Sequence, residues 1–394
     1  MGEHMTRTMH RPASEVDEAP MEAVAGGPPP RRRGRLAAVA TAAVVLAAAA
    51  GLAVIRSGDD GTDVSQGGTA PGSAGEPADA TEPAPTPPSE PAPAPAPAAS
   101  TAATASCPTA APSPPGPRVD AAVAGDPSGL LVLGGADGSG NRPNDTWAFA
   151  CGAWARPARA GSPAPPFGTE SAAAYDAARG HTLLVASDQS TWTWKDGAWA
   201  QHPTATKPTR LSDGAMAYDA TRQRVLLFGS AMKGGALELW SWDGASWSKA
   251  SVNGAAPPDR SGAAFAYDAA RGKAVLFGGM LGFGKEFGDT WTYDGSRWTE
   301  AKPKHSPPAG PGYAAFDPVR GNVVLLVRGE TWTWDGADWA KRETASSPGA
   351  RGGTQLTWDP TTQKVVLFGG KTFDAAAGDL WAWDGRDWAK ASSS

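Results

Sequence analysis

The sequence contains few of the residues that most catalytic and metal sites require. Only 2 cysteines, 5 histidines and 5 tyrosines occur among 394 residues, and no two histidines stand at the spacing of a metal site. No Gly-x-Ser-x-Gly nucleophile motif is present. A net charge of −5 excludes the broad basic surface that nucleic-acid binding needs. We therefore expect no metal, no cofactor and no nucleic-acid partner.

Tryptophan is missing from the first third of the chain, since all 17 tryptophans lie after residue 146. Residues 1–35 are polar and rich in proline and glycine, and residues 56–117 include the run TEPAPTPPSEPAPAPAPAAS. Such segments bury too little apolar surface to form a core, and the Pro-Ala run favours extended polyproline II. We predict a disordered cytoplasmic tail over residues 1–35 and a disordered linker, rich in Pro, Ala and Gly, over residues 56–117.

Long hydrophobic runs are also scarce, and one stands out: twenty uncharged residues from Leu36 to Ile55. At about 1.5 Å per residue, a helix of this length spans roughly 30 Å of hydrocarbon. Four arginines lie just before it: Arg31, Arg32, Arg33 and Arg35. By the positive-inside rule, residues 36–55 form a single helix across the plasma (inner) membrane, with the N-terminus cytoplasmic and the rest in the periplasm or at the cell surface. The alternative is a cleaved signal peptide, and under both interpretations the remainder is exported.

The remaining chain contains six copies of one pattern. In each copy a tryptophan is followed two residues later by another aromatic residue and seven residues later by a second tryptophan. The first tryptophans are Trp147, Trp192, Trp240, Trp291, Trp332 and Trp381, the aromatics Phe149, Trp194, Trp242, Tyr293, Trp334 and Trp383, and the second tryptophans Trp154, Trp199, Trp247, Trp298, Trp339 and Trp388. Six matches at fixed spacing indicate a structural repeat.

Each copy has the pattern of four short strands. An Ala-rich strand ends in Asp, a tight turn leads to an apolar strand such as KAVLFGG, and a variable loop leads to an alternating strand such as TWTYDG. In five copies Asp-Gly then makes a two-residue turn into the fourth strand. Because one small twisted sheet cannot bury both faces alone, the repeat predicts a propeller. We predict an all-β, six-bladed β-propeller over residues 118–394, with the tryptophan columns packed between blades.

The repeat resembles kelch repeats, in the form found in bacterial propellers similar to galactose oxidase. The resemblance rests on a Gly-Gly doublet after the apolar strand, followed by the aromatic columns: Gly134–Gly135, Gly278–Gly279 and Gly369–Gly370. Blade 3 has Gly229–Ser230, and blades 2 and 5 lack the doublet. The resemblance implies the propeller fold. It does not extend to the copper site of galactose oxidase, because the tyrosines here are mostly copies of repeat columns and the histidines are scattered.

One stretch of blade 4, VLFGGMLGFGKEFGDTW from Val275 to Trp291, is nearly a P-loop. Glu286 stands where that motif needs a hydroxyl for magnesium, and a strand follows where a phosphate cradle needs a helix. We therefore predict no nucleotide site. The glycines instead favour a turn with positive φ at the exit of the second strand.

Loop lengths indicate which face carries the selectivity. We define the upper face as the rim that holds the loops between second and third strands and the connections between blades. The spacing from the Asp that ends strand one to the first tryptophan is 21, 16, 21, 23, 15 and 22 residues, so blades 1 to 3 match blades 4 to 6. This pattern predicts a duplicated three-blade unit and a groove across the upper face between blades 2 and 5.

Two polar sets are predicted to bind ligand on the upper face. The first comprises arginines eight or nine residues before the Asp that ends strand one: Arg118, Arg210, Arg260 and Arg351. The second comprises acids two residues before the first tryptophan: Asp145, Glu238, Asp289, Glu330 and Asp379. The arginines would grip a carboxylate or an acidic sugar, and the acids would hold a cation or basic ligand. The alternative is local: each arginine fixes its own inter-blade loop, and each acid caps loop amides.

The two cysteines, Cys107 in the linker and Cys151 in the blade 1 turn, form an even pair. Outside the cell such a pair favours a disulfide, which would attach the linker to the outer edge of blade 1. Every blade is complete in chain order, so we expect no strand exchange to close the ring, and the disulfide would partly replace it.

Three functions fit these features. The first is an extracytoplasmic, membrane-anchored binding module that presents its upper face to a glycan or protein ligand. The second is an exported carbohydrate-active enzyme that uses acidic residues in the upper groove. The third is a structural envelope protein without a specific ligand. Of these three functions we expect the binding module. Because propellers serve many functions, the fold and the sequence do not identify its ligand.

Overall fold

The computed structural model describes residues 113–158, 161–232, 236–282 and 284–392. The predicted tail over 1–35, the predicted membrane helix over 36–55, nearly all of the linker over 56–117, and Cys107 lie outside these ranges. Within them, no helix has the length and apolar character needed to span a bilayer.

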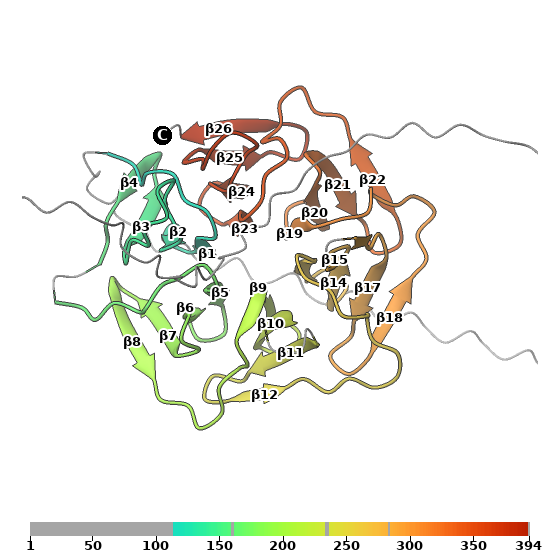
Figure 1. The fold of residues 1–394 in the computed structure, drawn as a ribbon, viewed down its shortest axis with the longest axis horizontal. Helices are drawn as coiled ribbons and strands as arrows, with labels where there is room; N and C mark the ends of the chain where they lie inside the picture. The colour runs from blue at the N-terminus through green and yellow to red at the C-terminus, as the bar shows by residue number, and fades with distance from the viewer. Residues whose placement is uncertain (1–112, 159–160, 233–235, 283, 393–394) are drawn as a thin grey trace, which may run out of the picture. The chain divides into compact units, whose positions relative to one another are not determined.

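The described chain is all-β and forms six four-stranded antiparallel sheets, each built from consecutive strands. Figure 1 shows these sheets as blades around a central axis, in chain order from β1 to β26. The first three blades are β1 (Ala122–Asp126), β2 (Gly129–Leu133), β3 (Thr146–Ala150) and β4 (Ala153–Ala155); β5 (Ala172–Asp176), β6 (His181–Val185), β7 (Thr191–Lys195) and β8 (Ala198–His202); and β9 (Leu211–Asp219), β10 (Arg224–Ala231), β11 (Leu237–Trp242) and β12 (Trp247–Lys249). The six-bladed propeller predicted from the repeat is thus confirmed.

The last three blades repeat the arrangement. They are β13 (Ala264–Asp268), β14 (Lys273–Phe277), β17 (Thr290–Tyr293) and β18 (Trp298–Ala301); β19 (Gly312–Asp317), β20 (Asn322–Val327), β21 (Glu330–Trp334) and β22 (Trp339–Arg342); and β23 (Gln355–Asp359), β24 (Lys364–Phe368), β25 (Leu380–Trp383) and β26 (Trp388–Ser392). In every blade the innermost strand is the first one, so six Ala-rich strands surround the axis.

The Gly-rich stretch of blade 4 is a connection between strands. Its middle forms a small hairpin of β15 (Met280–Leu281) and β16 (Lys285–Glu286), and β17 follows it. Gly278 and Gly279 have φ of 68° and 96°, in the region that favours glycine. Glu286 pairs with Arg328 of blade 5. The positive-φ exit predicted for these glycines is confirmed.

The tryptophan columns pack between neighbouring blades. Five of the largest fully buried side chains are tryptophans of these columns: Trp242, Trp334, Trp339, Trp383 and Trp388. In four blades the second tryptophan also donates its indole N–H to a threonine of the preceding blade, at 2.8–2.9 Å: Trp199 to Thr146, Trp247 to Thr191, Trp339 to Thr290, and Trp388 to Thr331. The equivalent positions in blades 3 and 6 are Leu239 and Leu380, so this column also repeats after three blades.

On the lower face, opposite the upper loops, arginine side chains connect neighbouring blades. In blades 2 to 5 an arginine pairs with the Asp that ends its own strand one and donates to a backbone carbonyl of the next blade: Arg179 to Asp243, Arg222 to Asp294, Arg271 to Gly321, and Arg320 to Asp384. Blade 6 has Thr362 at the equivalent position, and its hydroxyl bonds only Asp359 among the contacts of the described chain. Blade 1 has Gly129 there, so the junctions from blade 6 to blade 1 and from blade 1 to blade 2 both lack the arginine bridge.

The junction from blade 6 to blade 1 is closed by other contacts. Side chains of β23 accept backbone N–H groups of β1, from Val123 to Gln355 and from Gly125 to Thr357, each at 3.2 Å. The backbones approach so closely that a Cβ on Gly125 would lie 1.7 Å from the Trp358 carbonyl oxygen. As expected, each described blade is complete without an exchanged strand. Cys151 is disulfide-bonded, and its predicted partner, Cys107, lies outside the described residues.

Candidate functional site

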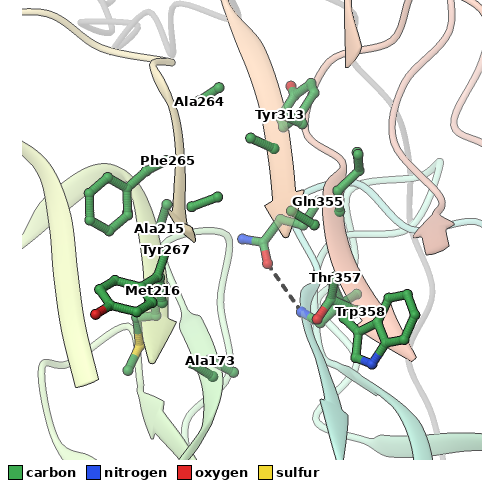
Figure 2. A pocket seen from close by; sticks show the side chains of 18 of the residues that line it. Ala173, Ala215, Met216, Ala264, Phe265, Tyr267, Tyr313, Gln355, Thr357 and Trp358 are labelled. Carbon is green, nitrogen blue, oxygen red and sulfur yellow. Dashed lines mark hydrogen bonds between the residues drawn. The ribbon is translucent and has the colours of Figure 1, made fainter. Parts of the chain in front are cut away.

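The central channel of the described chain contains a cavity of about 400 Å³. All six innermost strands line it. Alanines such as Ala173, Ala215 and Ala264 form much of the wall, and Figure 2 shows that these small side chains leave the middle open. Its volume lies within the range of small-molecule sites, which are mostly apolar with a few converging polar groups.

The upper mouth of the channel holds most of those polar groups. Six residues before the Asp that ends strand one, blades 1 to 3 carry acids and blades 4 to 6 do not: Asp120, Glu170 and Asp213, against Gly262, Pro311 and Gly353. All but Pro311 line the channel. One half of the mouth is therefore acidic, and the opposite half is neutral.

Two of the acids occupy backbone conformations that favour glycine. The φ angles of Asp120 and Asp213 are 56° and 50°, close to those of Gly262 and Gly353 in the same column, 65° and 60°. A non-glycine residue is uncommon there, although Asp and Asn tolerate the region best. The column thus accepts glycine by conformation, and the two aspartates place carboxyl groups where the fold does not require them.

The environment of these two carboxyls disfavours their charge. Burial, reinforced by repulsion from Asp213, raises the pKa of Asp120 to about 6, and Arg142 offsets this only in part. Burial also raises the pKa of Asp213, where a hydrogen bond from the Gly262 N–H opposes the rise and Glu170 adds to it. Asp213 nevertheless has an exposed side chain that lines the channel, so water from the channel reaches its carboxyl and weakens the effect of burial. Such perturbed groups at a cavity are typical of functional sites.

Tyr313 and Gln355 provide neutral groups on the opposite half. The Tyr313 hydroxyl accepts the Gly353 N–H at 2.8 Å, and burial together with Asp213 and Asp120 raises the pKa of Tyr313 to about 12, so the phenol keeps its proton. Gln355 accepts the Val123 N–H through its side-chain oxygen, and Figure 2 shows its amide nitrogen directed into the open space. Both residues can therefore donate hydrogen bonds to a molecule in the mouth.

Replacing Asp120 with asparagine is expected to stabilise the protein at pH 7.5 by about 1–2 kcal/mol. The folded pKa near 6 lies above the unfolded value, so the wild type loses stability as the pH rises through that window. Asparagine tolerates the same φ and cannot ionise. Urea unfolding at pH 4 and 7.5 measures the difference, with Asp374→Asn, an exposed acid of the blade 6 loop, as control. An Asp120→Asn variant with wild-type pH dependence would contradict this environment.

Three of the four predicted arginines are held within their own blades. Arg260 is fully buried and binds both oxygens of Asp289 at 2.5 and 2.8 Å. Arg351 binds Asp379 at 2.8 Å, and Arg118 binds Asp145 at 3.1 Å. Each also donates to backbone carbonyls nearby, among them Gly278, Gly369 and Pro117. The geometry matches the local alternative, and a ligand role for these arginines stays a prediction.

The predicted acids bind tryptophan side chains rather than converge on one point. In five blades the acid accepts the indole N–H of the first tryptophan two residues on, at 2.7–3.0 Å, from Trp147, Trp240, Trp291, Trp332 and Trp381. Ser190 does the same for Trp192 in blade 2. Glu238 and Glu330 also pair with Lys249 and Lys341. The expectation that these acids cap loop amides is replaced by indole capping, and their ligand-binding role also stays a prediction.

Arg210 differs from the other arginines because it is exposed. It pairs with Glu170, the acid of blade 2 at the mouth, whereas Asp120 has only the unpaired influence of Arg142. No ion pair within 4 Å involves Asp120 or Asp213 among the residues that the structure places. Within the same ranges, no group of three or more His, Cys, Asp or Glu side chains could hold a metal ion.

Sequence reasoning missed Asp120, Asp213, Tyr313 and Gln355 as a group. The signal was present, because alignment of the six blades on the Asp that ends strand one places Asp120, Glu170 and Asp213 in one column. The arginine column lies two or three residues earlier, and its positive charge led to its prediction as the ligand site instead. Three of its four side chains turn back into their blades, with Arg210 the exception, whereas most of the later column lines the channel.

Comparisons with known proteins do not identify a family for this chain. No family model matches the chain, and no curated protein matches it. A solved structure titled "Structure of YjhT" is similar over 71% of this chain and 98% of that chain, with 13% identity and a TM-score of 0.48. The propeller assignment therefore rests on the six sheets of this chain.

Proposed function

We propose that the chain is a membrane-anchored, extracytoplasmic binding module whose ligand enters the upper mouth of the central channel. One observation carries the proposal: a channel of about 400 Å³ opens between Asp120 and Asp213 on one half and Tyr313 and Gln355 on the other. A site of this size accepts a small group, so it fits a sugar unit of a glycan or the end of a peptide better than a folded domain. Export follows from the apolar segment over 36–55 and remains part of the proposal.

Glycan-array binding by the purified full-length chain is expected to fall at least tenfold in the double variant Asp120→Asn, Asp213→Asn. The substitutions remove both carboxyl groups without changing side-chain size. The control is Asp374→Asn, which removes one exposed charge outside the channel lining and should bind like the wild type. Undiminished binding by the double variant would place the ligand elsewhere, and binding to no glycan or peptide probe would contradict the module.

The second candidate is the exported carbohydrate-active enzyme, and the pKa of Asp120 favours it. A carboxyl group whose pKa is near 6 can act as general acid, and Asp213 acts on it across the mouth. Release of nitrophenol from aryl glycosides, lost in both Asp120→Asn and Asp213→Asn, would support the enzyme. Binding without turnover would support the module.

A further inference from the structure

The charge balance of the mouth shows what a ligand would supply. Three arginines near it are neutralised by Asp145, Asp289 and Asp379, and Arg210 pairs with Glu170. Asp120 and Asp213 stay without an ion pair within the described chain. Asp213 repels the charge of Asp120, and Arg142 offsets this repulsion only in part. Two like charges in a partly enclosed mouth repel, and a cation between them relieves both the repulsion and the missing solvation.

The kind of cation follows from the groups available. The described residues contain no set of three His, Cys, Asp or Glu ligands, so a dehydrated divalent metal finds too few of these side-chain ligands here. An ammonium group needs fewer partners, since it has three N–H donors for carboxylate oxygens. The mouth thus fits an organic ammonium ion.

The neutral half of the mouth indicates the body of the ligand. The Tyr313 hydroxyl accepts the Gly353 N–H and keeps its own proton, and no acceptor for that proton occurs among the placed residues. The amide nitrogen of Gln355 points into the channel (Figure 2). Two donors facing the acids suit a ligand with hydroxyl acceptors, as in a sugar ring, better than an alkyl chain.

Blades that are three apart in the ring show which residues of the mouth the fold does not require. Blades three apart keep the same residue where packing decides, as with Thr146 and Thr290 or Leu239 and Leu380. At the mouth the same pairs of blades differ: Asp120 against Gly262, Glu170 against Pro311, Asp213 against Gly353, Ala172 against Tyr313, and Ala215 against Gln355. The two halves have the same fold without sharing these side chains, so the fold does not require the polar residues of the mouth. Their presence therefore favours a role in ligand binding.

We infer that the ligand of the upper mouth is an amino sugar with a free primary ammonium, held between Asp120 and Asp213, with its hydroxyls toward Tyr313 and Gln355. The inference rests on the proposed function and specifies its ligand class. Acetylation of the amine removes the positive charge and adds bulk, so the N-acetyl sugar should be rejected.

Calorimetric titration of the purified full-length chain at pH 7.5 tests the inference with glucosamine, N-acetylglucosamine, glucose and cadaverine as probes. Glucosamine is expected to bind at least tenfold more tightly than each of the other three. Asp120→Asn and Asp213→Asn should each reduce glucosamine affinity at least tenfold, and Asp374→Asn should leave it unchanged. This selectivity would support the inference.

The remaining outcomes oppose the inference in distinguishable ways. Equal binding of glucosamine and glucose, lost in the two aspartate variants, overturns the ammonium and leaves the binding module intact. Tightest binding of cadaverine overturns the sugar body but keeps the cation. Absence of binding by all four probes, together with a negative glycan and peptide array, overturns the proposed function itself.

Discussion

Replacing Arg260 with alanine is expected to cost about 3–5 kcal/mol of folding free energy, the usual effect of leaving one buried charge without its partner. The guanidinium is fully buried, binds both oxygens of Asp289, donates to the Gly278 and Pro258 carbonyls, and stacks over Phe287 at 4.0 Å. The substitution removes all of these contacts, leaves the Gly278 carbonyl without this buried donor, and leaves Asp289 with the Trp291 indole but no counter-charge. Urea unfolding at pH 7.5 measures the loss.

The control for this variant is Arg210→Ala. Arg210 belongs to the same sequence column, but it is exposed and its ion pair with Glu170 faces water, so about 0–1 kcal/mol is expected. Burial tends to raise the pKa of Asp289, but hydrogen bonds from Arg260 and Trp291 outweigh it and hold the pKa below the usual value. The Arg260 contribution should therefore be complete above about pH 4 and disappear in more acidic solution. Wild-type stability of Arg260→Ala combined with lost ligand binding would instead restore the ligand role predicted from the sequence.

The sequence specified the fold well because the propeller depends on features that recur at fixed spacing. Six tryptophan pairs seven residues apart indicate the third and fourth strands of every blade, and Asp-Gly indicates the turn between them in five blades. The structure then places those tryptophans between blades, as predicted. Three-dimensional contacts without a local pattern stayed hidden, such as the bridge from Arg179 to the next blade.

The candidate site was predicted less well for a physical reason. An arginine and an acid in fixed columns can face a ligand or each other, and spacing does not distinguish these, since Arg260 and Asp289 are 29 residues apart in the chain. The direction of a side chain at a left-handed residue such as Asp120 is equally absent from the sequence pattern. Only the position of the channel shows which column faces it.

Replacing Gly125 with alanine is expected to destabilise the propeller by about 3 kcal/mol, at the upper end of the usual cost of overpacking. The new methyl group would overlap the Trp358 carbonyl oxygen, 1.7 Å away, and push β1 from β23. That movement also strains the hydrogen bonds from Val123 to Gln355 and from Gly125 to Thr357. At this junction Thr362 replaces the arginine that bridges blades on the lower face, so that bridge does not oppose the opening.

Thermal unfolding measures the stability that Gly125→Ala loses, and hydrogen exchange shows in which strands protection is lost. Faster exchange is expected in β1 and β23, while blades 3 and 4, on the far side of the ring, keep wild-type protection until global unfolding. Gly284→Ala is the matched control, since a Cβ there meets nothing within 4 Å and its backbone has ordinary φ. If Gly125→Ala unfolded like Gly284→Ala, the close approach of first and last blades would not be what closes the ring. Uniformly faster exchange in all six blades would indicate that the ring opens only as a whole, with the junction no weaker than its neighbours.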